Sequence, residues 1–204
     1  MSDVRVLIVE DEVLIAQDIA DSLAAIDYQV SGIAYTSERA LDLLASTHPD
    51  IVLLDIQIKG SMNGIDLAHI ITRDYQIPFV FLTSFADKTT VEEAKKTVPY
   101  GYVIKPFSDR ELFTSLELAV YRFTLEHRQT IPNRQKINER TIQDLTQKEY
   151  EVLEDLCQGL TNKQLSEKHF ISLNTVKTHV RKILEKMEAP NRASVIRKVF
   201  SQAK

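Results

Sequence analysis

Short apolar runs alternate with helical patterns over the first 125 residues, and this alternation restricts the fold more than any other feature. Residues 51–54 are four consecutive apolar residues, two of them β-branched, as expected of a strand that a parallel sheet buries on both faces. Similar runs occur at 4–9, 30–34, 78–82 and 100–104. Five such strands alternating with five helices predict an α/β fold with a doubly wound, five-stranded parallel sheet.

Polar residues stand where these predicted strands end. Glu10 and Asp11 follow the first run, and Asp55, Thr83 and Lys105 close the third, fourth and fifth. Taken alone, Asp55 fits a simple turn former equally well. The carboxyl ends of parallel strands, however, meet at one edge of the sheet, where open α/β sheets bind ligands. We therefore expect these side chains to gather in one crevice.

Three carboxylates in one crevice repel one another unless a cation neutralises them. An all-oxygen cluster suits Mg²⁺, which keeps several waters and bridges to phosphate oxygens. Thr83 offers a hydroxyl and Lys105 a positive charge, both suited to the oxygens of a phosphoryl group. A carboxylate can act as the nucleophile and carry the phosphoryl as an acyl phosphate. These residues together predict phosphoryl transfer.

The net charge of −4 divides unevenly along the chain. Residues 1–125 carry 10 Lys and Arg against 19 Asp and Glu, a net −9, and residues 126–204 carry 15 against 10, a net +5. The basic second part favours a polyanionic partner such as nucleic acid. A single cysteine, Cys157, excludes an internal disulfide, and the longest apolar runs are too short to span a membrane. We expect a soluble cytoplasmic protein.

Residues 3–125 resemble the receiver domain of two-component response regulators, a flavodoxin-like fold. The resemblance rests on Glu10-Asp11, Asp55, Thr83, Tyr102 and Lys105-Pro106. It implies that Asp55 is the phosphoacceptor, that a sensor histidine kinase is the partner, and that Thr83 and Lys105 bind the phosphoryl group. It also implies switch roles for Thr83 and Tyr102, and a cis peptide bond before Pro106. The implied ligands of Mg²⁺ are Glu10, Asp11, Asp55 and the backbone carbonyl of Gln57.

The loop after Asp55 departs from the family pattern. Lys59 stands where the family usually has a proline, and Gly64 falls nine residues after Asp55 rather than eight. A loop that is one residue longer and has no proline is expected to be less stiff. This expectation bears on the position of the Gln57 carbonyl and on metal affinity.

Residues 144–204 show only helical patterns, after a polar segment at 126–143 that we interpret as a linker. Thr146-x-x-Glu149 is a capping box, Thr161 and Ser172 precede two further helices, and Asn191 precedes the last one. A short helix, a tight turn and a longer helix with a basic outer face form a helix-turn-helix, whose second helix enters the DNA major groove. The predicted organisation is a receiver domain at 1–125, a linker at 126–143 and a small all-α DNA-binding domain at 144–204.

Basic residues on the second helix and beside it are the candidate DNA contacts. Lys177 and Arg181 are four residues apart, so their side chains project together and can reach base edges. Neighbouring polar residues are expected to meet phosphates or the groove, namely Thr178, Lys163, His179, Lys182 and Lys186. A solvated basic face is the alternative for any single helix. The stretch 145–199 also resembles the LuxR-type helix-turn-helix, through residues such as Gly159, Ile171-Ser172, Thr175-Val176-Lys177-Thr178-His179 and Asn191-Arg192.

Together these resemblances imply a response regulator that accepts a phosphoryl group and controls transcription by binding double-stranded DNA as a homodimer. Val195 and Val199 are candidate dimer contacts, with the helical core as the alternative. Three other functions are alternatives to this interpretation. A Mg²⁺-dependent phosphatase would need a second carboxylate two residues after Asp55, where this chain has Gln57. An RNA-binding domain would need more aromatic residues after Tyr150 than the chain has. A receiver that is never phosphorylated would not need the complete acceptor set.

Overall fold

The computed structural model describes residues 4–25, 28–84, 88–126 and 131–200. The chain divides into two compact units, one formed by Arg5–Val120 and one by the chain from Tyr121 onward together with Val4. No helix within the described ranges is both long and apolar enough to cross a membrane.

The first unit contains a five-stranded parallel sheet in the order β2-β1-β3-β4-β5. The strands are β1 Val4–Val9, β2 Tyr28–Ala34, β3 Ile51–Asp55, β4 Phe79–Thr83 and β5 Gly101–Ile104. All five residues of β3 and of β4 are buried, as expected of central strands covered on both faces. The predicted doubly wound fold is confirmed.

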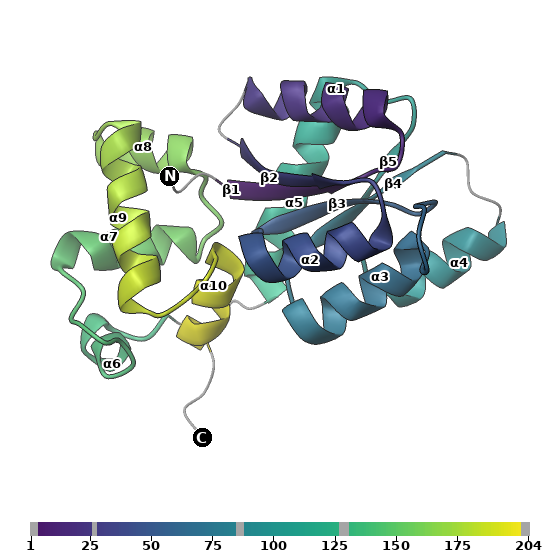
Figure 1. Ribbon diagram of the computed structural model, residues 1–204. Helices are drawn as coiled ribbons and strands as arrows, with labels where there is room; N and C mark the ends of the chain where they lie inside the picture. The colour runs from purple at the N-terminus through teal and green to yellow at the C-terminus, as the bar shows by residue number, and fades with distance from the viewer. Residues whose placement is uncertain (1–3, 26–27, 85–87, 127–130, 201–204) are drawn as a thin grey trace. The chain divides into compact units, whose positions relative to one another are not determined.

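Helices cover both faces of this sheet, and Figure 1 shows α1 on one face and α2 and α3 on the other. A hydrogen bond of 2.7 Å from Ser22 Oγ to Asp109 Oδ1 joins α1 to the start of α5. The helices are α1 Val13–Ala24, α2 Ser37–Thr47, α3 Gly64–Ile70, α4 Lys88–Lys96 and α5 Asp109–Glu126, and the π-helix η1 Ile71–Tyr75 continues α3. Polar side chains cap several of them: Ser108, for example, exchanges hydrogen bonds with Glu111 at the start of α5.

The strand register brings the predicted polar residues to one sheet edge. Val9 pairs with Leu54 and Asp55 with Leu82, so Glu10, Asp55 and Thr83 follow one another across neighbouring strands. Because all strands are parallel, their carboxyl ends coincide.

Gly64 allows α3 to begin directly beside this edge. Its backbone N–H donates to the carbonyl oxygen of Ile56 at 2.9 Å. A Cβ atom at this position would lie 2.0 Å from the carbonyl oxygen of Asp55, well inside the van der Waals limit. A glycine is therefore required for α3 to pass this close to the end of β3.

The substitution Gly64→Ala is expected to lower the free energy of unfolding by about 1–3 kcal/mol, because the methyl group forces backbone apart in a packed region. Urea denaturation followed by circular dichroism measures this. Gly32→Ala is the matched control, since its added Cβ would meet only side-chain atoms of Leu43, at 3.0 Å or more. Equal stability of Gly64→Ala and the unmodified protein would contradict the steric argument.

The second unit is helical, with a three-helix arrangement at its centre. Its helices are α6 Arg134–Asn138, α7 Gln147–Leu156, α8 Asn162–His169, α9 Leu173–Lys186 and α10 Arg192–Phe200. The predicted caps are present: Thr146 and Glu149 form a capping box on α7, Ser172 accepts from Thr175 N–H, and Asn191 accepts from Ser194 N–H.

The segment interpreted as a linker contains structure that its polar composition does not indicate. Helix α6 lies inside it, Ile137 is buried, and Asn138 Oδ1 accepts a hydrogen bond of 3.0 Å from Leu145 N–H. The part from Arg134 onward thus packs with the helical unit. The boundaries at 126 and 143 stay a prediction.

Candidate functional site

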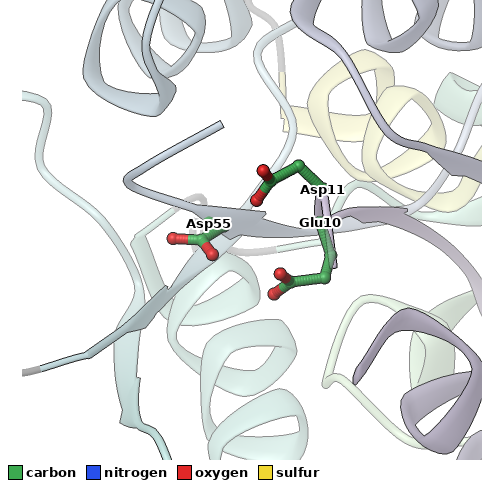
Figure 2. A group of neighbouring side chains, drawn as sticks. All are labelled: Glu10, Asp11 and Asp55. Atoms are coloured by element: carbon green, nitrogen blue, oxygen red, sulfur yellow. The ribbon is translucent and has the colours of Figure 1, made fainter. Parts of the chain in front are cut away.

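Three carboxylates converge at the carboxyl edge of the sheet. Glu10, Asp11 and Asp55 each offer an oxygen within 4.8 Å of the others, and Figure 2 shows the three side chains directed into a common space. Glu10 and Asp55 are buried, and Asp11 is half-buried. This spacing and this all-oxygen donor set fit a small divalent cation such as Mg²⁺, whose ligands stand about 2.0–2.1 Å from the ion and include several waters.

Lys105 binds two of these carboxylates. Its Nζ lies 2.5 Å from Asp55 Oδ2 and 2.5 Å from Glu10 Oε2, and its side chain is almost fully buried. Burial opposes the charge of Lys105, but the hydrogen bonds to Asp55 and Glu10 outweigh it and raise the pKa of the ammonium. Burial raises the pKa of Glu10, and the contact with Lys105 offsets only part of this rise. Burial is thus the main cause of the raised pKa of Glu10, and a divalent cation bound beside it would lower that pKa.

The peptide bond between Lys105 and Pro106 is cis, as the family resemblance implies. The Lys105 backbone N–H donates to the carbonyl oxygen of Thr83 at 2.8 Å. Strand β4 and the residue after β5 thus hold each other at the site.

Thr83 and Tyr102 lie where a switch would need them. Thr83 is buried at the end of β4, and its hydroxyl donates to the carbonyl oxygen of Ser84 at 3.2 Å. Tyr102, in the middle of β5, is 40% exposed, and its ring stands 5.8 Å from that of Phe81. The Thr83 hydroxyl is thus bonded within its own turn, and the Tyr102 side chain is partly open to solvent. Their switch roles stay predictions.

The loop after Asp55 is bonded at several points rather than loose. Gln57 N–H donates to Asp55 Oδ1 at 2.9 Å, which fixes the acceptor side chain. Farther along, Ser37 N–H donates to the carbonyl oxygen of Lys59 at 2.9 Å, and Ser61 N–H donates to Glu38 Oε1 at 2.7 Å. The first turn of α2 thus anchors this loop by hydrogen bonds, and its lower stiffness relative to the family pattern stays a prediction.

In the second unit, α8 and α9 form the predicted helix-turn-helix. Val176, Val180 and Ile183 on α9 are buried, which leaves the opposite face of the helix to solvent. The three-residue connection between the helices passes through Phe170, which has a left-handed backbone with φ of 53° and is 95% exposed.

The predicted base-reading residues lie on the outer side of α9. Arg181 is exposed, with its Nε 3.7 Å from Glu185 Oε1, and Lys177 is half-buried. Thr178 is exposed, and its hydroxyl donates to Asn174 O at 2.9 Å. Two further predicted phosphate contacts are exposed, Lys163 and Lys182.

His179 and Lys186 are placed differently from these residues. Lys186 Nζ lies 2.7 Å from Glu149 Oε2 and donates to Asp144 O at 2.8 Å, and its side chain is only 13% exposed. Burial lowers the pKa of His179, which leaves its imidazole neutral near pH 7. Lys186 thus joins α9 to α7, and His179 offers no charge to a phosphate. Their phosphate contacts remain untested predictions that this placement disfavours.

Val195 and Val199 are each 1% exposed. The sequence left two interpretations of them open, and this burial agrees with the core interpretation. Their predicted dimer contact stays a prediction.

Two polar contacts that sequence reasoning missed also organise the helix-turn-helix. Arg192 donates from Nη2 to Asn162 Oδ1 at 2.9 Å, and both groups are buried. Asp155, at the end of α7, accepts from Lys168 and contacts His169 at the end of α8. No sequence signal pairs residues of separate helices.

Comparison with known protein families gives two matches. The family described as response regulator receiver domain matches residues 6–117, and the family described as bacterial regulatory proteins, luxR family, matches residues 143–199.

Individual proteins match either the first unit or most of the chain. The transcriptional regulatory protein PdtaR of Mycobacterium tuberculosis is 39% identical over 119 residues, which is 58% of this chain and 58% of PdtaR, so the chain spans less than two thirds of that relative. The uncharacterized transcriptional regulatory protein YxjL of Bacillus subtilis is 29% identical over 204 residues, covering 95% of this chain and 93% of YxjL.

Solved structures divide in the same way. The response regulator ChrA of a heme-sensing two-component system aligns with a TM-score of 0.50 at 27% identity, over 97% of this chain and 96% of ChrA. The receiver domain of a diguanylate cyclase from Desulfovibrio desulfuricans aligns with a TM-score of 0.57 at 34% identity, over 60% of this chain and 97% of that structure.

Proposed function

The chain belongs to the response regulators, with a receiver domain followed by a luxR-family DNA-binding domain, and on that premise we propose that phosphorylation of Asp55 controls its binding to DNA. This architecture is that of a two-component transcription factor rather than of a conventional enzyme. In this proposal Asp55 is the phosphoacceptor, Mg²⁺ is the metal ion, a sensor histidine kinase is the partner, and α9 contacts DNA. The protein acts in the cytoplasm.

The phosphoryl donor in this proposal is a phosphohistidine of a sensor kinase. An oxygen of the Asp55 carboxylate attacks the phosphorus, the phosphorus–nitrogen bond breaks with its electron pair going to the imidazole, and an acyl phosphate forms. Lys105 and Thr83 bind the oxygens of the transferred group. When bound by Glu10, Asp11, Asp55 and the Gln57 carbonyl, Mg²⁺ supplies further neutralisation of negative charge.

One observation carries this proposal: the buried Lys105 ammonium reaches both Glu10 and Asp55 while Asp11 lies within 4.8 Å of them. Lys105 and Lys59 supply two positive charges against these three carboxylates, so one negative charge of the cluster is left over. This surplus negative charge favours binding of a metal ion, and the Asp55 carboxylate beside that ion can act as an oxygen nucleophile.

The proposed switch follows from the positions of Thr83 and Tyr102. A phosphoryl group on Asp55 draws the Thr83 hydroxyl inward, and the half-exposed Tyr102 ring turns into the space that is left. The surface built by α4, β5 and α5 changes with it and favours a homodimer. The dimer then presents two copies of α9 to half-sites one helical turn apart.

Incubation with acetyl phosphate tests the proposed function. The unmodified protein is expected to gain the mass of one phosphoryl group with Mg²⁺ present and to gain far less with EDTA, as intact-mass spectrometry measures. Selection of bound duplexes from a random DNA library, with and without this treatment, should then enrich one sequence more strongly after phosphorylation. A mass gain that does not depend on Mg²⁺ would count against the metal site, and equal enrichment would count against control by phosphorylation.

A further inference from the structure

A second lysine, Lys59, reaches the acidic cluster from the loop after Asp55. Its Nζ lies 2.9 Å from Asp11 Oδ2, on the carboxylate that Lys105 does not contact. The hydrogen bond and the charge of Asp11 raise the pKa of Lys59, so the ammonium form is the one present. Each of the three clustered carboxylates therefore has a lysine of the same chain beside it.

Hydrogen bonds anchor the backbone of this loop, so the Cα atom of Lys59 stays near the cluster. Its carbonyl oxygen accepts from Ser37 N–H, and Met62 N–H donates to Ser37 Oγ at 3.3 Å. Gly60, with φ of 131°, passes so close to α2 that a Cβ there would lie 2.2 Å from Ser37 Oγ. The extra loop residue is thus absorbed against the first turn of α2, and the Lys59 side chain starts from a constant position.

The Lys59 side chain itself is weakly held. It is 74% exposed, and an exposed ion pair contributes only about 0.2–1 kcal/mol. Lys59 is therefore a tethered cation. Its ammonium leaves the Asp11 carboxylate easily, and the anchored backbone keeps the effective concentration of the ammonium near Asp11 high.

We propose that Lys59 is an internal counter-ion that competes with the divalent cation for Asp11 and so sets the Mg²⁺ affinity of the receiver. Mg²⁺ and the Lys59 ammonium compete for the Asp11 carboxylate, because two cations in contact with one carboxylate repel each other. In the metal-free protein Lys59 takes over part of the neutralisation that Mg²⁺ provides. This inference rests on the proposed function, since it assigns a role to Lys59 at the same metal site.

The substitution Lys59→Gln is expected to tighten Mg²⁺ binding about fivefold, the equivalent of about 1 kcal/mol. Isothermal titration of the full chain with MgCl₂ at constant ionic strength measures the dissociation constant. Lys59→Arg keeps the charge and should bind Mg²⁺ like the unmodified protein. Arg73→Gln removes an exposed charge paired with Asp74, away from the cluster, and controls for net charge.

Thermal unfolding adds a readout that a merely structural role would not give. Without metal, Lys59→Gln should melt below the unmodified protein, because Asp11 then faces Asp55 and Glu10 without its counter-ion. With saturating Mg²⁺ the difference should shrink or reverse, since tighter binding stabilises the folded state more. The affinity difference should also decrease at high KCl, which screens exposed charges.

Equal Mg²⁺ dissociation constants for the unmodified protein and Lys59→Gln would overturn the inference while leaving the metal site intact. Weaker binding by Lys59→Gln would overturn it too, and would make Lys59 a support for the loop. Absence of Mg²⁺ binding in every variant, the unmodified protein included, would remove the metal from the proposed function, and the role of Lys59 with it.

Discussion

Asp55→Asn is expected to abolish the gain of a phosphoryl group from acetyl phosphate, the largest effect that any single substitution should have on this protein. The asparagine amide can still accept the hydrogen bond from Gln57 N–H through Oδ1, so the loop keeps one of its fixed points. It carries no charge, however, and its oxygen is a poor nucleophile. Intact-mass spectrometry after incubation with acetyl phosphate and Mg²⁺ measures the loss.

Asp18→Asn is the control for this experiment, because Asp18 is an exposed residue of α1 that differs from Asp55 in its environment alone. It should be phosphorylated like the unmodified protein. A circular dichroism spectrum of Asp55→Asn should remain that of the unmodified protein, which separates lost chemistry from lost folding. If Asp55→Asn gains the same mass as the unmodified protein, the acceptor is another residue.

Joint replacement of Lys177 and Arg181 by alanine is expected to remove most of the preference of the helical unit for its selected DNA sequence. A good contact between a basic side chain and a base is worth about 1–3 kcal/mol of discrimination, so the two contacts together correspond to roughly 30-fold or more. The ratio of dissociation constants for the selected duplex and a scrambled one, measured by fluorescence anisotropy, reports this preference.

Lys163→Ala is the matched comparison, since Lys163 is exposed on α8 and is assigned to a phosphate. It should weaken binding to both duplexes equally and reduce the slope of log affinity against log salt by about one. If the double variant keeps the full preference, bases are read by other residues. If the unmodified protein binds RNA duplexes as tightly as DNA duplexes, DNA is not its specific partner.

Much of the fold followed from signals that act over a few residues. The capping box at Thr146 needs only a side chain three residues away, so the sequence locates the start of α7 correctly. The alternation of strands and helices predicts a parallel sheet, and a parallel sheet brings Asp11 and Asp55 to one edge whatever the loops do. The acidic cluster was predictable for that reason.

The contacts that escaped prediction depend on residues far apart in the chain. Lys59 was recognised as a departure from a family pattern, but its contact with Asp11 depends on the path of a loop that α2 holds. Lys186 lies near the basic face of α9 by helical spacing, yet Glu149 of α7 binds it. Helical spacing gives a direction around one axis and contains no information about the neighbouring helix.

Because α9 is attached to the helical unit through its last turn, the stability of that unit and its DNA sequence preference depend on different residues. Lys186 binds Glu149 and Asp144, and its carbonyl oxygen accepts from Ile142 N–H, all at the carboxyl end of α9. Arg181 lies more than one turn before that end, and its side chain is exposed. Exposed positions of α9 can therefore change during evolution without weakening the fold, so paralogues of this protein can acquire new operators while they retain the same scaffold.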